Sequence, residues 1–393
     1  MVTVSGFLRI SVFAVCGFFF IVFLNQRDVH PYTKAPIKYT EPIQDEEPTP
    51  NFTIPVVTIA DVIKHQKFYM HKRFAEFQFP SNLKLSNFTL ATGGQPIRSV
   101  VITTWRSGST FLGDVLNAVP GNFYHYEPLL NFGIVQIRGP PLAQLAISNL
   151  KNLLKCNYYD MQNYLSYGKT HIYLFTHNLR LWNECEQYPQ FCWNATFLSE
   201  FCKLYPFQSM KVVRLRLKLA EELLKDESLN VKVLLLIRDP RGTLQSRKHR
   251  EWCPGVSDCD HPDLLCTDMV SDYSAAVDLQ KKYSNRFRAI RYEDLSLDPY
   301  KHVRELFDFF GLNVHQNVIN FLDSHTKANS GGVSSTFRDS KNAPFHWRND
   351  LNFSEVQYIE DNCEKAMKLW GYVRAKNESH LREFNPVTSY VID

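Results

Sequence analysis

The segment Ser99–Asp114 joins an apolar run to several groups that bind anions. Its β-branched residues 100–104 favour a strand that is covered on both faces, and Gly108 allows a sharp backbone turn. A serine and a threonine then open an amphipathic helix. Free backbone N–H groups, two hydroxyls and Arg106 would meet at this helix N-terminus, which predicts a phosphate site. The alternative is an ordinary strand-to-helix turn with an exposed arginine.

A second segment, Asn230–Arg247, repeats this layout of apolar strand, turn and helix. Pro240 suits the first turn of a helix. Ser246 and Arg247 follow about two helical turns later, where they could meet a second anion. Two such sites predict a ligand with phosphate groups at both ends. The Walker A pattern Gly-x-x-x-x-Gly-Lys-Ser/Thr is absent, which disfavours a P-loop kinase.

Both segments carry a family resemblance. Trp105-Arg-Ser-Gly-Ser-Thr-Phe111 resembles the 5′-phosphosulfate loop of carbohydrate sulfotransferases, and Arg238-Asp-Pro-Arg-Gly-Thr-Leu-Gln-Ser246 resembles their 3′-phosphate motif. The match is to the Golgi family that sulfates the 6-hydroxyl of galactose, N-acetylgalactosamine or N-acetylglucosamine, over residues 96–375. The resemblance implies 3′-phosphoadenosine-5′-phosphosulfate (PAPS) as donor. It assigns donor binding to Trp105, Arg106, Ser107, Gly108, Ser109, Thr110, Phe111, Arg238 and Ser246.

The same resemblance implies the catalytic groups. Arg106 stands where soluble sulfotransferases carry a lysine, and it would clamp the 5′-phosphate and stabilise the leaving group. Residues 123–128 end a strand with a Glu-Pro pair, so Glu127 is predicted as the general base, with a proton affinity raised by burial. The alternative is a structural glutamate paired with an arginine. His125 is the reserve base, because strand alternation puts it on the same face as Glu127.

Roles can also be predicted for three further segments. Residues 340–348 resemble the part of the family that closes over the nucleotide, so Trp347 would stack on adenine and Arg348 would reach phosphate; a core tryptophan beside a surface arginine is the alternative. Residues 291–295, Arg-Tyr-Glu-Asp-Leu, resemble a strand-end motif and are predicted to be structural. In the basic cluster that begins at Arg238, anion binding is also favoured for Arg241, and Asp239 is expected to brace the turn.

The alternation of patterns predicts a P-loop-like α/β fold, with a parallel sheet flanked by helices and ligands at the carboxyl ends of the strands. Strands are predicted at 98–104, 122–126, 209–213, 231–237 and 286–291, and helices at 109–118, 216–225, 240–249, 268–284, 300–310 and 354–369. The resemblance assigns residues 96–376 to a sulfotransferase domain, followed by a C-terminal tail at 377–393.

Residues 7–24 form the one long hydrophobic span, and their number suits a bilayer crossing. We interpret them as a type II signal anchor behind a cytosolic tail of residues 1–6; a cleaved signal peptide is the alternative, although no small-x-small cleavage site follows. Prolines and acidic residues at 31–50 argue against a packed core in 25–95, which is interpreted as a luminal stem with one helix near 61–78. This predicts a single-pass Golgi membrane protein with a luminal catalytic domain.

The composition of the chain limits the kinds of partner that we expect. The chain of 393 residues is 44% apolar and 14% aromatic, enough for a large domain, and its net charge of +4 indicates no nucleic-acid partner. Eight cysteines follow the span, an even number that favours disulfides in an oxidising lumen. A zinc site at Cys253, Cys259 and Cys266 lacks paired Cys-x-x-Cys spacing, so no metal is expected. Five Asn-x-Ser/Thr sequons also lie beyond the span, at Asn51, Asn87, Asn194, Asn352 and Asn377.

Together these features predict an enzyme that sulfates a sugar hydroxyl, most simply the 6-hydroxyl, on glycoprotein or proteoglycan glycans. Its partners would be the glycan acceptor and the membrane, and the sequence leaves homo-oligomerisation open. The alternatives are a sulfotransferase for tyrosine or heparan sulfate and a catalytically silent glycan-binding relative. The acceptor would be selected by segments such as 130–200, whose pattern does not reveal its identity.

Overall fold

The computed structural model of the chain describes residues 57–79, 83–332 and 335–392. The chain divides into two compact units, residues 1–56 and 57–393, and the second contains all the described residues. The predicted cytosolic tail, the anchor at 7–24 and stem residues 25–56 lie outside the described part. Within the described part, no helix has the length and apolar character needed to cross a membrane.

Five parallel strands form the central sheet in the order β2-β3-β1-β4-β5. Nearly every strand residue is buried, as a parallel sheet with two covered faces requires. The five predicted strands are therefore confirmed, with ends shifted by at most two residues. Their bounds are β1 Ile97–Ile102, β2 Asn122–Tyr126, β3 Phe207–Val212, β4 Val231–Ile237 and β5 Phe287–Arg291.

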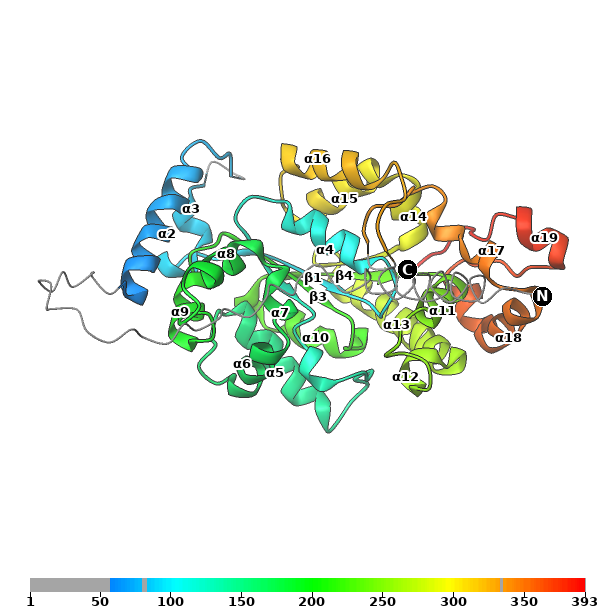
Figure 1. Cartoon of the computed structure of the whole chain (residues 1–393). Coiled ribbons are helices and arrows are strands. Elements are labelled where there is room, and N and C mark those ends of the chain that lie inside the picture. Colours follow the sequence, from blue (N-terminus) through cyan, green and yellow to red (C-terminus); the bar gives the residue numbers. More distant parts are fainter. Residues whose placement is uncertain (1–56, 80–82, 333–334, 393) are drawn as a thin grey trace, which may run out of the picture. The chain divides into compact units, whose positions relative to one another are not determined.

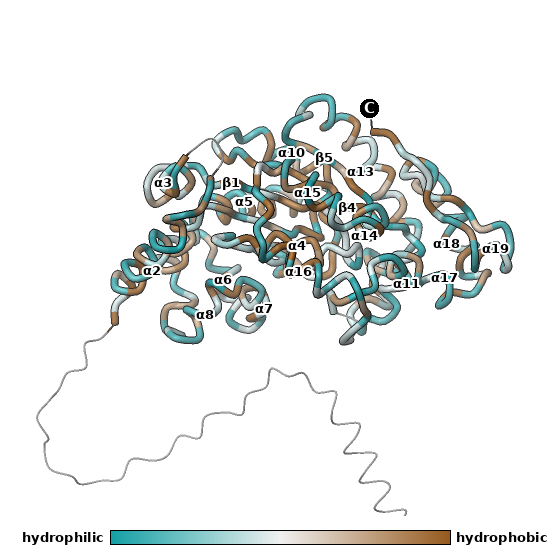
Figure 2. The backbone as a smooth tube through the Cα atoms, turned by 90° about the horizontal axis from the view of Figure 1, so that it is seen from above, coloured by the Kyte–Doolittle hydropathy of each residue, from teal (hydrophilic) through white to brown (hydrophobic). Residues whose placement is uncertain are grey.

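Helices cover both faces of this sheet (Figure 1). α4 (Ser109–Asn117) and α15 (Pro299–Phe310) pack on one face, and α10 (Leu217–Lys225) and α13 (Pro262–Lys282) on the other. Figure 2 shows hydrophobic stretches along the central strands between these layers. The other α-helices of the described residues are α2 Ile59–Arg73, α3 Leu85–Phe88, α5 Leu142–Leu154, α6 Gln162–Thr170, α7 Tyr173–Thr176, α8 Leu179–Gln187, α9 Ala195–Cys202, α11 Pro240–Lys248, α12 Ser257–Asp260, α14 Tyr292–Leu297, α16 Gln316–His325, α17 Trp347–Asp350, α18 Phe353–Leu369 and α19 Glu378–Glu383.

The segment between β2 and β3 contains the short helices α5 to α9, which the sequence patterns did not separate. α5 buries a strip of apolar residues against α10. Two disulfides, Cys156–Cys202 and Cys185–Cys192, hold the rest of the segment together. These cross-links stabilise helices of nine residues or fewer that would be marginal in isolation.

All eight cysteines of the described residues form disulfides, as the even count predicts. Cys253 pairs with Cys259 within one loop, and Cys266 on α13 pairs with Cys363 on α18, 97 residues away. The three cysteines considered for zinc are all consumed by these bonds. The covalent link between α13 and α18 fixes the late helices against the sheet-covering layer.

The expectation that residues 25–95 lack a packed core is wrong for their described part. Val62 and Met70 on α2 are buried in the hydrophobic core, and Gln66 donates a hydrogen bond of 2.9 Å to the hydroxyl of Tyr205. The prolines and acids behind that expectation end near residue 50, whereas residues 62, 66 and 70 recur at helical spacing. The predicted tail at 377–393 likewise packs on the domain, because α19 buries Leu381.

We expect Met70→Ala to destabilise the protein by about 2–5 kcal/mol, because a 2% exposed side chain leaves a cavity that its surroundings fill only in part. Phe68→Ala, on the same helix but 69% exposed, serves as the control and should change stability by less than about 0.5 kcal/mol. Denaturant unfolding of residues 57–393 measures both. Equal, negligible effects would show that α2 does not pack on the domain.

Candidate active site

A cavity of about 740 Å³ opens at the carboxyl edge of the sheet, where ligands of parallel α/β folds bind. The sheet order divides it into two parts. Arginine-rich loops follow β1 and β4, with the start of α14 after β5; we call this the arginine half. Glu127 and Lys211 lie at the ends of β2 and β3; we call this the glutamate half.

The loop between β1 and α4 is built to receive an anion. Arg106 (φ 67°) and Gly108 (φ 84°) both adopt the left-handed conformation. A Cβ atom at Gly108 would lie 2.2 Å from the Cδ2 atom of Tyr292, so only glycine fits there. Gly108 is also the N-cap of α4 and offers no capping side chain to the first-turn N–H groups. These features favour the predicted phosphate site at the start of α4.

Unlike the other residues of this loop, Ser107 does not line the cavity. Its hydroxyl lies 2.5 Å from that of Thr103 and donates to the carbonyl oxygen of Thr104 at 2.8 Å. The side chain is fully buried and does not line the cavity. Ser107 therefore braces the loop, and its hydroxyl does not face a ligand. The remaining predicted loop residues line the cavity: Trp105, Arg106, Gly108, Ser109, Thr110 and Phe111.

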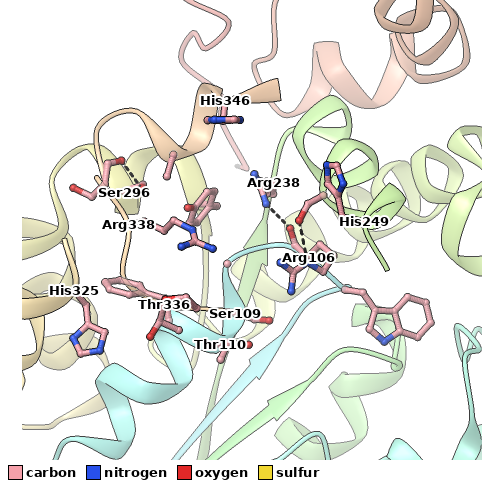
Figure 3. A pocket seen from close by; sticks show the side chains of 18 of the residues that line it. Arg106, Ser109, Thr110, Arg238, His249, Ser296, His325, Thr336, Arg338 and His346 are labelled. Carbon is pink, nitrogen blue, oxygen red and sulfur yellow. Dashed lines mark hydrogen bonds between the residues drawn. The ribbon is translucent and has the colours of Figure 1, made fainter. Parts of the chain in front are cut away.

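The two predicted anion sites are in direct contact. Arg106 Nε donates to Ser246 Oγ at 2.9 Å, and Arg238 Nη1 donates to the carbonyl oxygen of Arg106 at 2.7 Å. Figure 3 shows Arg106, Arg238 and Arg338 directed into the same space from three segments. Burial, together with the charges of Arg250 and Arg238, lowers the pKa of Arg106 to about 10. Arg106 is therefore charged at neutral pH, and an anion would relieve the repulsion around it.

Glu127 is ionised, contrary to the expectation of a raised proton affinity. Its Oε1 accepts from Lys211 Nζ at 2.9 Å, and its Oε2 accepts from Arg214 Nη1 at 2.8 Å. Burial opposes ionisation of the carboxyl, but the charges of Lys211 and Arg214 outweigh it and lower the pKa to about 2. The predicted base thus has the arginine partner of the structural alternative. It also lines the cavity, so its carboxylate is within reach of a ligand there.

The reserve base lies elsewhere. His125 is 3% exposed, does not line the cavity, and has its ring centroid 5.2 Å from that of Phe123. Burial lowers its pKa to about 3, so it is neutral. Although His125 and Glu127 are two residues apart, Glu127 has left the strand with φ 40° and no longer follows its alternation. The structure therefore places His125 outside the cavity.

Two residues of the segment 340–348 also differ from their predicted positions. Trp347 is 1% exposed with the Arg241 guanidinium 4.2 Å from its ring, and Arg348 donates to the carbonyl oxygen of Phe384 at 2.6 Å. Neither Trp347 nor Arg348 lines the cavity. The buried guanidinium of Arg241 already pairs with Glu360 and Asp239, so Arg241 does not bind an external anion.

The turn after β4 has the predicted brace. Asp239 accepts from the backbone N–H of Arg241 at 2.9 Å and caps α11. Glu293 accepts from the backbone N–H of Asp239 at 3.0 Å, which gives residues 291–295 their expected structural role. Tyr292 of this motif does more, because its ring lines the cavity 4.8 Å from the Arg238 guanidinium.

Several residues that line the cavity were not predicted from the sequence as site residues. Lys211 could have been noticed as a charged residue in an otherwise buried strand, but its pairing with Glu127 depends on the sheet order. Arg250 and Trp252 follow α11, and Arg338 lies in a late loop; no local motif marks any of them.

A parallel α/β fold with clustered arginines at the carboxyl edge of the sheet is suited to bind an anionic ligand. A family model described as a sulfotransferase domain matches residues 96–371, and the chain belongs to this family. The predicted resemblance to carbohydrate sulfotransferases is confirmed by its relatives, and the protein is an enzyme of this kind.

Carbohydrate sulfotransferase 5 of Mus musculus is 25% identical over 334 residues, covering 74% of this chain and 85% of that protein. Carbohydrate sulfotransferase 3 of Mus musculus is 27% identical over 328 residues, covering 72% and 69%. Among solved structures, the sulfotransferase domain from the Synechococcus PCC 7002 olefin synthase aligns at 18% identity with a TM-score of 0.39. That alignment covers 69% of this chain and 94% of that chain.

We expect the wild-type kcat/KM to show no acid limb from Glu127 between about pH 5 and pH 8, because its pKa of about 2 keeps it ionised throughout. Lys211→Met removes one of the two charges that hold the pKa down. The pKa then rises to or above its ordinary value of about 4.3, so kcat/KM falls as the pH drops from about 6 to about 4. Lys218→Met, exposed on α10, is the control and keeps the wild-type profile. Identical profiles for Lys211→Met and wild type would refute this electrostatic account.

Proposed function

We propose that the protein transfers a sulfuryl group from PAPS to a sugar hydroxyl. The proposed position is the 6-hydroxyl of N-acetylglucosamine, galactose or N-acetylgalactosamine, on glycoprotein or proteoglycan glycans. The observation that carries the proposal is the division of one cavity between clustered arginines and a buried glutamate–lysine pair. The arginine half suits a donor with two anionic ends, and the glutamate half suits an acceptor hydroxyl that must lose a proton.

The residues of the arginine half fit this donor. Arg106 and the N-terminus of α4 would hold the 5′-phosphosulfate, and Arg238 with Ser246 would hold the 3′-phosphate. Arg106 donates to the Ser246 hydroxyl, and Arg238 donates to the backbone carbonyl oxygen of Arg106, which supports neighbouring sites for the two ends of one nucleotide. PAPS supplies an activated sulfuryl group when bound; the chain supplies charge and orientation.

Two residues would act on the reacting atoms. Arg106 stabilises the negative charge that grows on the leaving phosphate; its guanidinium hardly releases a proton, so its role is electrostatic. Glu127 receives the proton of the acceptor hydroxyl. A carboxylate with a pKa of about 2 is a weak base, but a hydroxyl oxygen becomes strongly acidic as it bonds to sulfur. Proton transfer late in a loose, in-line displacement therefore suffices.

Lys211 connects the two halves of the cavity. Its ammonium donates to Glu127 and also to Thr110 Oγ1 on α4 at 3.3 Å. It therefore fixes the proposed proton acceptor relative to the helix that would hold the 5′-phosphosulfate. The intact arrangement disfavours the catalytically silent alternative, because a binding protein would not need an ionised carboxylate oriented in this way.

We also propose the Golgi membrane as the location, with single-pass type II topology and a luminal catalytic domain. Four disulfides are typical of an oxidising compartment. The sequon asparagines within the described residues are exposed, which suits glycosylation: Asn87, Asn194, Asn352 and Asn377. Membrane attachment through residues 7–24 belongs to this proposal.

Loss of either donor arginine should weaken nucleotide binding. We expect Arg106→Ala and Arg238→Ala each to reduce affinity for adenosine 3′,5′-bisphosphate about ten- to a hundredfold, because each removes one charge-assisted contact. Arg304→Ala, exposed on α15 and outside the cavity lining, is the control and retains wild-type affinity. Titration calorimetry measures all three. Wild-type affinity in both test variants would exclude the proposed two-phosphate site.

The reaction itself is tested by incubating the wild-type luminal domain with labelled PAPS and a panel of defined glycans. The proposal requires a sulfated sugar, and linkage analysis of the product identifies the hydroxyl. Glu127→Gln should then lower turnover by about 10²–10⁴-fold while nucleotide affinity stays unchanged. Asp350→Asn, a second carboxylate of the cavity lining, is the control. A folded, fully active Glu127→Gln would move proton removal to another group.

A further inference from the structure

We propose that Trp252 is the platform on which a sugar ring of the acceptor stacks. This inference rests on the proposed sulfuryl transfer to a carbohydrate and names where the acceptor binds. Trp252 lines the cavity and is 40% exposed, although a tryptophan of a soluble domain normally buries most of its surface. Its exposure within a cavity is explained by a ligand that covers it.

The surroundings of Trp252 form one apolar wall of the cavity. Its ring packs edge-on against the ring of Trp105, with 6.1 Å between centroids and an interplanar angle of 65°. Trp105 belongs to a small buried cluster with Val213, Cys253 and Cys259. Trp105, Val213 and Trp252 all line the cavity. The wall therefore offers an aromatic surface with a buried support.

The loop that carries Trp252 is rigid. The disulfide between Cys253 and Cys259 closes the loop directly after the tryptophan. Arg247 on α11 ties this loop to the domain by donating to the carbonyl oxygen of Cys259 at 2.6 Å and to that of Trp105 at 3.2 Å. A ring held in place before binding loses little conformational entropy when a ligand stacks on it.

The wall lies where the two halves of the cavity meet, because Trp105 follows β1 and Val213 follows β3. Val213 directly follows β3, and the partly buried Ile134, which follows β2, packs against the same cluster. A chain of contacts leads from Trp252 through Trp105 to Arg214, whose guanidinium lies 5.5 Å from the Trp105 ring and pairs with Glu127. The platform is thus connected to the proposed proton acceptor.

The chemistry of a pyranose fits this wall. One face of the ring presents C–H groups, which pack on the electron-rich face of an indole, and its edge carries hydroxyls. A sugar stacked on Trp252 can therefore turn a hydroxyl toward Glu127. Adenine is the competing aromatic ligand, because Trp105 is adjacent to Arg106 in the loop after β1, and the nucleotide affinity of Trp252 variants distinguishes the two ligands.

The test compares Trp252→Leu, which removes the aromatic face, with Trp252→Phe, which keeps a smaller one. Using the acceptor on which the wild type is active, we expect Trp252→Leu to raise the acceptor KM about tenfold or more. Its kcat and its affinity for adenosine 3′,5′-bisphosphate should stay unchanged, and Trp252→Phe should recover part of the loss. Tyr358→Leu on α18, 63% exposed and outside the cavity lining, is the control and keeps the wild-type KM.

A second measurement needs no variant. In saturation-transfer NMR of the wild type, irradiation of aromatic protons should transfer magnetisation to the C–H protons of one acceptor sugar. A wild-type acceptor KM in Trp252→Leu overturns the inference, and so does a loss of nucleotide affinity in that variant, which would place adenine on the ring. If the wild type sulfates no glycan, the proposed function itself fails, which is a distinct result.

Discussion

The buried charge cluster of Glu127, Lys211 and Arg214 is the interaction on which the geometry of the cavity depends. It ties the end of β2 to β3, and through Lys211 and Arg214 it reaches Thr110 on α4 and the ring of Trp105. Removing Glu127 would leave two buried cations without their counter-charge, at a cost of about 3–5 kcal/mol. The cluster therefore fixes the position of the proposed proton acceptor relative to the start of α4 and the loop before it.

The net pKa shifts of Arg241 and Arg106 differ because their neighbours carry opposite charges. Asp239 and Glu360 surround Arg241, and although burial alone would lower its pKa, these carboxylates raise it. Burial and neighbouring cations lower the pKa of Arg106 to about 10. Arg241 is thus stabilised by the fold itself, whereas Arg106 is held at an electrostatic cost that an anionic ligand would relieve. Such a cost is typical of a binding site, where the protein supplies one half of an interaction and the ligand the other.

Local signals explain what the sequence could predict. β4 matches its predicted bounds because all its residues except Lys232 are apolar, and β2 matches because it is rich in aromatic residues that favour strands. The loop at 105–111 could be recognised because its motif lies in consecutive residues. The pKa of Glu127 could not be predicted, since it depends on a lysine 84 residues away that the sheet order brings within 2.9 Å. The expectation for Trp347 failed for the same reason: its ring is covered by Arg241, from a helix more than 100 residues earlier. α13 begins six residues before its predicted start, because Pro262 suits a helix N-terminus although the apolar periodicity begins later.

The sheet order also separates the parts of the chain that can vary independently. The proposed donor groups follow β1 and β4, and Tyr292 follows β5, so the same three loops must be kept wherever the same nucleotide is used. Two segments border the glutamate half. One contains α5 to α9 between β2 and β3, and the other is the disulfide-closed segment after α11 that carries Trp252. Changes in these segments alter the surface offered to an acceptor without moving Arg106 or Arg238. In the proposed function, one donor site would therefore be compatible with different acceptors, and the acceptor would be selected by segments whose sequence patterns reveal least about their partners.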